Sequence, residues 1–110
     1  MSDVVAITER RSAPRYAVFR GCSIIAAGTI TEVTILNLSR NGIATLGPGL
    51  PVTPGERVTY CIEGVPHLLE AVAVNVSYGR IGARFDLTPD AAADWAETFR
   101  NLLAEAAPLD

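Results

Sequence analysis

Three arginines near the start of the chain are the side chains best suited to chemistry. Arg10, Arg11 and Arg15 fall within six residues, on a stretch without apolar periodicity and with Pro14 just before the last of them. A guanidinium presents a planar fork of donors that matches a phosphate or the O6 and N7 acceptors of guanine, and its flat face stacks on aromatic rings. The stretch therefore indicates a site for a compact anion or a nucleotide.

A second polar cluster, Asn37-x-Ser39-x-x-Gly42, ends a run of β-branched residues. The cluster supplies an amide, a hydroxyl and a glycine that tolerates a tight turn. A purely structural interpretation stays open, because these residue types and the Asn41-Gly42 pair are common in hairpin turns. Arginines near a chain end are likewise more often solvated than ligand-bound.

Two further arginines are candidate ligand contacts. Arg40 lies inside the second cluster, where a solvated side chain is the alternative. Arg84 lies in the last expected strand and is expected to face outward, where an ion pair with a neighbouring carboxylate is an equal alternative.

The charge distribution favours a small ligand over an extended polymer. The 110 residues carry a net charge of -3, yet residues 1–20 hold four arginines against two acids, and residues 86–110 hold six acids against one arginine. Extended nucleic acid is normally met by a broad basic face, so no DNA or RNA partner is expected. An oligonucleotide-binding barrel is a weaker alternative, because the three Tyr, three Phe and one Trp fall mostly at core-like positions.

Composition indicates one folded domain in the cytoplasm. Hydrophobic residues make up 49% of the chain, which is typical of a globular protein. The start lacks the pattern of a signal peptide, and no run approaches the roughly 18 apolar residues of a membrane span, so no membrane insertion is expected. Cys22 and Cys61 are expected to stay reduced as small buried hydrophobes.

Runs of β-forming residues between turn signals predict a mainly β fold. The six expected strands are residues 16–25, 29–38, 43–46, 56–62, 68–78 and 81–87. A helix should follow, with Thr88 as its N-cap, Pro89 at its first position, an apolar face around Trp95 and Phe99, and Pro108 marking its end. The pattern predicts a six-stranded antiparallel β-barrel with a C-terminal α-helix, over residues 10–107, after a flexible lead-in of residues 1–9.

Together, Arg11-x-x-x-Arg15 and Asn37-x-Ser39-x-x-Gly42 on such a barrel resemble the PilZ family of cyclic di-GMP receptors. The resemblance covers essentially the whole chain and includes Gly55 before a strand and residues 81–85 in the last one. It implies a stand-alone receptor that changes conformation on binding cyclic di-GMP and signals through an unidentified effector protein. The family often has aspartate at the position of Asn37, and Arg10 stands where the family's residue favours an intercalated pair of ligands over a single one.

The resemblance assigns the ligand contacts to Arg10, Arg11, Arg15, Asn37, Ser39 and Gly42, with Arg40 and Arg84 as secondary contacts. A ligand-independent PilZ-type adaptor is the alternative, although the intact motifs argue against it. An enzyme is not expected, and neither a metal nor a cofactor is, since the sequence offers no metal cluster, no nucleophile beside a base and no paired carboxylates. The regulated pathway, the affinity and the oligomeric state are left open.

Overall fold

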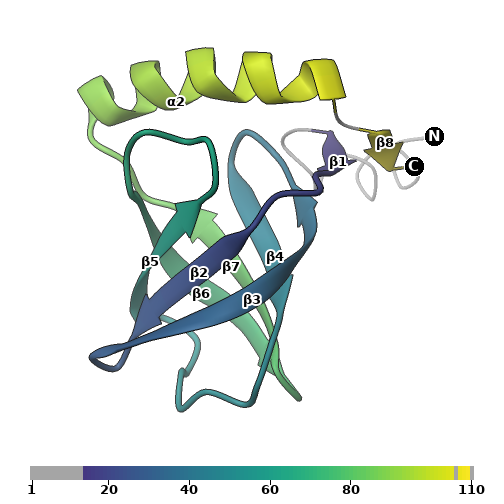
Figure 1. Cartoon of the computed structure of the whole chain (residues 1–110). Helices are drawn as coiled ribbons and strands as arrows, with labels where there is room; N and C mark the ends of the chain where they lie inside the picture. Colours follow the sequence, from purple (N-terminus) through teal and green to yellow (C-terminus); the bar gives the residue numbers. More distant parts are fainter. Residues whose placement is uncertain (1–13, 106, 110) are drawn as a thin grey trace, which may run out of the picture.

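The computed structural model describes residues 14–105 and 107–109, so Arg10, Arg11 and the expected lead-in of residues 1–9 lie outside the described residues. Within these ranges a β-barrel carries one long helix across its end (Figure 1). Its elements are β1 (Arg15–Ala17), β2 (Cys22–Ala26), β3 (Thr29–Leu38), β4 (Gly42–Leu46), β5 (Arg57–Ile62), β6 (Leu69–Ser77), β7 (Arg80–Phe85), helix α2 (Pro89–Leu102), the 3₁₀ helix η1 (Leu103–Glu105) and β8 (Ala107–Leu109).

Six antiparallel strands close the barrel. They follow the order β2-β5-β6-β7-β4-β3, and pairing of β3 with β2 joins the two ends. Closure removes the open sheet edges that an isolated sheet of this size would expose. The predicted six-stranded barrel with a C-terminal helix is confirmed, and the short strands β1 and β8 extend the sheet outward from β3.

The barrel interior is apolar and holds one buried hydroxyl pair. Ile24, Leu38 and Leu69 have no exposed side-chain surface. The hydroxyls of Thr45 and Tyr60 lie 3.3 Å apart, so each has a hydrogen-bonding partner inside the core. Burial raises the pKa of Tyr60 to about 12, although its hydrogen bond with Thr45 acts in the opposite direction.

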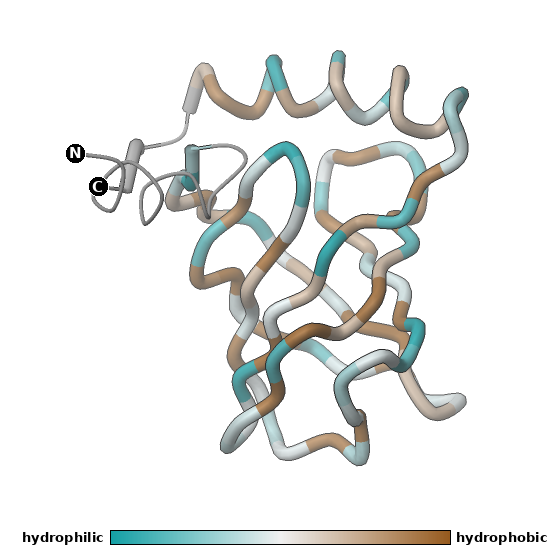
Figure 2. The backbone as a smooth tube through the Cα atoms, turned by 180° about the vertical axis from the view of Figure 1, so that it is seen from behind, coloured by the Kyte–Doolittle hydropathy of each residue, from teal (hydrophilic) through white to brown (hydrophobic). Residues whose placement is uncertain are grey.

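Helix α2 begins as predicted. The Thr88 hydroxyl accepts from the backbone N–H of Ala91 at 3.2 Å, and Pro89 occupies the start of the helix. Trp95 and Phe99 are buried against the barrel, with ring centroids 5.3 Å apart. Hydrophobic and hydrophilic segments alternate along the helix, which is typical of a helix with one packed face (Figure 2). No helix in the described part of the chain is long and apolar enough to span a membrane.

The first predicted strand is wrong in its extent, because the chain leaves the sheet between β1 and β2. Polar groups of this segment bond to the loop after β5 instead of to a neighbouring strand. The Arg20 guanidinium donates to the Glu63 carbonyl at 3.1 Å, and the Gly21 N–H donates to the Glu63 carboxylate at 3.2 Å. These bonds satisfy the Gly21 N–H and the Glu63 carbonyl without a sheet partner.

The end of the helix also differs from the prediction. Helix α2 stops at Leu102, and residues 107–109 form β8, which pairs with β1 at Arg15 and Leu109. Pro108 therefore lies in a short edge strand, where its missing N–H costs little.

The two cysteines occupy opposite faces of the barrel wall. Cys22 is buried, as predicted, whereas the prediction of a buried Cys61 is wrong because that residue is exposed. In the β2–β5 register Cys61 pairs with Ser23, one position from the pair of Cys22 with Ile62, and alternate residues of a strand face opposite sides. Burial, with a smaller contribution from Cys61, raises the pKa of Cys22 to about 12.

Candidate ligand-binding site

Four residues on adjacent strands form a row across the outer face of the barrel. Asn37 of β3 pairs with Ala44 of β4, Ala44 pairs with Gly82 of β7, and Gly82 pairs with Asn75 of β6. Of the two central residues, Ala44 carries only a methyl group and Gly82 has no side chain, while the two outer residues carry amides. The row is therefore a low floor between two hydrogen-bonding walls.

A β-bulge places the first amide outside the barrel. The β3–β4 register shifts between Ile35 and Asn37. Ile35 is buried, so strict alternation would also turn Asn37 toward the core. The extra residue reverses the alternation, and Leu38 becomes the next fully buried side chain.

A second bulge does the same for the opposite amide. The β6–β7 register shifts between Ala73 and Asn75. Ala73 is buried and Val76 packs against the core, whereas Asn75 between them is exposed on the outer face. Both walls of the row thus depend on an interruption of the two-residue strand period.

The turn from residue 39 to residue 42 borders the row on one side. The Ser39 N–H donates to the Gly42 carbonyl at 2.9 Å, and the Ser39 hydroxyl accepts from the N–H groups of Asn41 and Gly42 at 3.2 and 3.1 Å. Ser39 therefore shapes the turn through its own side chain.

The Asn41-Gly42 pair does not form the hairpin turn that its sequence favours. Neither residue has a positive φ, although the turns at Ala27-Gly28 and Tyr78-Gly79 do. Gly42 is required for another reason. A Cβ at this position would lie 2.5 Å from the Ala83 carbonyl oxygen, so glycine allows β4 and β7 to approach.

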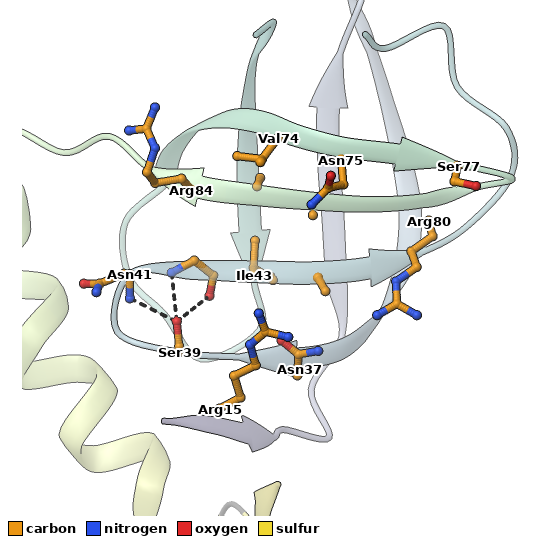
Figure 3. Close-up of a pocket in the computed structure, with 14 residues that line it drawn as sticks. Arg15, Asn37, Ser39, Asn41, Ile43, Val74, Asn75, Ser77, Arg80 and Arg84 are labelled. Carbon is orange, nitrogen blue, oxygen red and sulfur yellow. Dashed lines mark hydrogen bonds between the residues drawn. The ribbon is translucent and has the colours of Figure 1, made fainter. Parts of the chain in front are cut away.

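These elements enclose a cavity of about 350 Å³. It is lined by Arg15, Asn37, Ser39, Asn41, Gly42, Ile43, Ala44, Val74, Asn75, Ser77, Arg80, Gly82, Ala83 and Arg84 (Figure 3). Five residues named by the sequence thus meet at one site: Arg15, Asn37, Ser39, Gly42 and Arg84. Arg40 does not line this cavity; it lies beside helix α2, where its carbonyl accepts from the Trp95 indole N–H at 2.9 Å.

The cavity is cationic on an acidic protein. Arg15, Arg80 and Arg84 line it, and no Asp or Glu does so within the described residues. Arg80 and Arg84 are four residues apart on β7, which corresponds to about 13 Å of strand. Figure 3 shows Arg15 beside Asn37, with Arg80 and Arg84 toward opposite ends of β7. This arrangement suits a ligand with more than one anionic or acceptor-rich group.

Four polar lining residues were missed from the sequence, namely Asn41, Asn75, Ser77 and Arg80. A signal for Asn75 exists, because it follows Ala71 and Ala73 on the inward series of its strand, and a polar residue there indicates a bulge. Arg80 follows the Tyr78-Gly79 turn, which has positive φ at both residues and directs β7 back beside β6.

No group of three or more metal-ligating side chains occurs in the described part of the chain. The cavity itself is lined by neither cysteine, histidine nor carboxylate among the described residues. Its chemistry is that of arginine guanidiniums, amides, hydroxyls and backbone groups, which are binding groups.

Comparison with known proteins relates this chain to one family. The family model for the PilZ domain matches residues 9–105. The solved structure of the Bacillus subtilis inhibitor of motility, MotI/DgrA, is similar in fold, with a TM-score of 0.63 and 22% sequence identity. That match covers 87% of this chain and 50% of the other, so the chain spans half the length of MotI/DgrA. No curated protein matches the chain in sequence.

Proposed function

The chain belongs to the PilZ domain family, and on that premise we propose that it is a cytoplasmic receptor or adaptor that binds cyclic di-GMP. In this proposal the ligand changes the conformation of the chain, and the change is read by a partner protein. One observation carries the proposal: Arg15 from one motif and Asn37, Ser39 and Gly42 from the other converge on a single cationic cavity.

Cyclic di-GMP offers two phosphates and two guanines, and the cavity has groups that match both. The Arg15, Arg80 and Arg84 guanidiniums can bind phosphate or the O6 and N7 acceptors of guanine, and can stack on a base. The amides of Asn37 and Asn75 can exchange hydrogen bonds with the guanine edge. Ala44 and Gly82 between them leave room for a flat base on the floor.

Arg10 and Arg11 are proposed as additional contacts that join the site when the ligand binds. Both precede Arg15 in sequence, and Arg15 already lines the cavity from the short strand β1. Ordering of such an arm on a charged ligand converts a local contact into a change of the exposed surface. The ligand number is part of the proposal, since Arg10 favours a bound pair.

The remaining parts of the proposal, which concern catalysis, cofactors and partners, are based on the family and the composition. The chain is proposed to act without catalysis, metal or cofactor, and to need neither DNA, RNA nor a membrane. The neighbouring MotI/DgrA is named as an inhibitor of motility, which is compatible with a regulatory output through a partner. A ligand-independent adaptor remains the second candidate, and it predicts partner binding that does not respond to nucleotide.

Isothermal titration calorimetry with cyclic di-GMP tests the proposal. The wild-type chain should bind, and Arg11→Ala and Arg15→Ala should each weaken binding at least about tenfold, because charge-assisted hydrogen bonds contribute roughly 1.5–3 kcal/mol. Arg57→Ala is the matched control. Arg57 forms an ion pair with Asp86, with a nitrogen–oxygen distance of 2.8 Å, and does not line the cavity. Arg10→Ala should reduce the stoichiometry from two ligands to one.

Two results would contradict the proposal. One is the absence of any binding heat with the wild-type chain. The other is binding that Arg11→Ala and Arg15→Ala leave as tight as Arg57→Ala does.

A further inference from the structure

A second cavity, the helix groove, lies between β1, the turn after β3 and helix α2. It measures about 440 Å³ and is lined by Pro14, Tyr16, Arg40, Asn41, Ala96, Phe99, Arg100 and Leu103. Its lining includes two aromatic side chains, Tyr16 and Phe99, whose rings meet edge to face with centroids 6.0 Å apart. The candidate ligand site does not use this groove, and among the described residues only Asn41 lines both cavities.

The groove combines an apolar floor with positive charge. Arg40 and Arg100 line it and are both exposed, and the described lining residues include no acid. Arginine binds carboxylates through paired hydrogen bonds, and its charge is retained at any ordinary pH. The complementary occupant is therefore a short apolar segment that also carries carboxylates.

The chain itself contains such a segment four residues before the described part begins. Residues 3–9 read Asp3-Val4-Val5-Ala6-Ile7-Thr8-Glu9, with four apolar residues and one threonine between two acids. When extended, the four apolar residues span about 13 Å, and the helix from residue 96 to residue 103 spans about 10 Å, so their lengths are comparable.

The segment is also tethered at the right place. Glu9 is five residues from Pro14, a distance of at most about 17 Å, and Pro14 lines the groove. A tether of this length gives an effective concentration on the order of millimolar, so weak contacts suffice for docking.

We infer that residues 3–9 dock in the helix groove of their own chain, with Val4 to Ile7 on the apolar floor and the two acids near Arg40 and Arg100. Docking replaces the expected flexible lead-in by an anchored segment. It leaves residues 10–13 as a short link between the groove and the ligand cavity, because Arg15 lines the cavity while its neighbours Pro14 and Tyr16 line the groove.

Docking of residues 3–9 also affects the position of residues 10–13, and its effect on ligand binding rests on the proposed function. Arg10 and Arg11 lie in the link, so an anchored segment holds them near the cavity before the ligand arrives. A preordered arm loses less conformational entropy on binding, which favours affinity. Docking therefore contributes to cyclic di-GMP binding through residues that do not touch the ligand.

Disulfide trapping in the full-length chain tests the docking. A Cys61→Ser background removes the exposed native thiol and leaves only the buried Cys22. Ala6→Cys combined with Ala96→Cys, which lies in the groove, should form an intramolecular disulfide under mild oxidation without nucleotide. Ala6→Cys with Asn101→Cys is the matched control, because Asn101 is exposed on the same helix and does not line the groove.

The trapping experiment decides between clear outcomes. A disulfide rate at least about tenfold higher for Ala96→Cys than for Asn101→Cys supports the docking. Equal rates, no disulfide in either variant, or a disulfide-linked dimer each overturn it.

Charge reversal provides the second measurement. In the Ala6→Cys and Ala96→Cys chain, Arg40→Glu with Arg100→Glu should slow the disulfide several-fold, and adding Asp3→Arg with Glu9→Arg should restore the rate. Failure of the restoration would overturn the assigned charge pairing.

The effect of docking on the affinity for cyclic di-GMP is tested separately with Arg100→Glu alone, because Arg100 does not line the ligand cavity. This variant should weaken cyclic di-GMP binding about three- to tenfold. Unchanged affinity would overturn the link to ligand binding, whereas a wild-type chain that binds no nucleotide would overturn the proposed function and leave the trapping result intact.

Discussion

The inward and outward faces of strands β4 and β7 have different roles: one packs in the core and the other lines the ligand cavity. The inward residues are buried and apolar apart from one hydroxyl: Ile43, Thr45, Ile81 and Ala83. The outward residues form the floor and one end of the ligand cavity: Gly42, Ala44, Gly82 and Arg84. Since the two sets alternate along the same strands, neighbouring positions can be used to separate stability from binding.

The flanking strands make the outer face polar by interrupting that alternation. In β3 and β6 a bulge precedes Asn37 and Asn75 and brings each amide to the outside. The comparison teaches that regular alternation builds the core, whereas the candidate site depends on the two places where alternation stops.

The largest effect is expected at Gly42, an outward residue whose lack of a side chain allows β4 and β7 to pair closely. Gly42→Ala places a Cβ 2.5 Å from the Ala83 carbonyl oxygen and forces β4 and β7 apart. We expect it to lower the free energy of unfolding by about 2–3 kcal/mol, as overpacking does. Urea denaturation measures this loss.

Gly49→Ala is the control for that variant, because a Cβ there meets no atom within 4 Å and the residue has no positive φ. Its stability should stay within about 0.5 kcal/mol of wild type. A Gly42→Ala chain as stable as this control would contradict the assigned role of the close β4–β7 contact.

A second substitution should affect the cavity and spare the fold. A Cβ at Gly82 meets only Asn75, at 3.8 Å, so the strand accepts a side chain there. Gly82→Val should fill the floor of the cavity and weaken cyclic di-GMP binding at least about tenfold, equivalent to about 1.4 kcal/mol. Calorimetry and thermal melting measure the two effects, and a Gly82→Val chain that binds normally would place the ligand elsewhere.

The Ser39 turn should show an intermediate effect on both properties. Ser39→Ala removes the acceptor for the N–H groups of Asn41 and Gly42. We expect a loss of about 1 kcal/mol in stability and a weaker ligand response, since the turn borders the cavity. Ser39→Thr keeps the hydroxyl and is the matched control; equal losses in both variants would indicate a packing effect instead.

The smallest effect is a loss of stability at high pH, caused by the buried Cys22 and Tyr60 on the inner face. The pKa of Cys22 is raised from 9.0 to about 12 and that of Tyr60 from 10.0 to about 12, chiefly by burial. Above pH 9 the unfolded chain releases these protons before the folded chain does, so stability falls as pH rises toward 12. The loss should be about 1 kcal/mol between pH 9 and pH 10, most of it from Cys22, whose proton leaves the unfolded chain first.

Thermal melting between pH 8 and pH 11 measures that loss. Cys22→Ala should flatten the decline between about pH 9 and pH 10, since the unfolded thiol then no longer titrates. A decline that is as steep in Cys22→Ala as in the wild-type chain would contradict the assignment to the buried thiol.

The sequence predicted the barrel well because its core follows simple periods. Apolar residues alternate on the inward positions of β7, and Trp95 and Phe99 repeat at helical spacing, so strand and helix were both recognisable. The Thr88 cap and Pro89 were predicted for local reasons and occur as expected. β8 was missed because its three residues pair, within the described part of the chain, with β1 alone, a contact between residues 90 or more positions apart.

The candidate site was predicted less completely because it depends on tertiary geometry. Arg15 and Asn37 were found from residue type and spacing, yet Asn75 and Arg80 reach the cavity only through a bulge and a tight turn in β6 and β7. Gly42 was named as a turn and ligand contact, whereas the requirement for glycine that the structure shows comes from a neighbouring strand, and no local turn signal reports such a contact.

A nuclear magnetic resonance titration of the ¹⁵N-labelled chain with cyclic di-GMP tests the central claim most directly. The account predicts that the largest shift changes fall on the row across the outer face, at Asn37, Ala44, Gly82 and Asn75, including both side-chain amides. Strands β2 and β5 on the far side of the barrel should change little. Shift changes that are absent, or that concentrate on β2 and β5 and spare this row, would contradict the account.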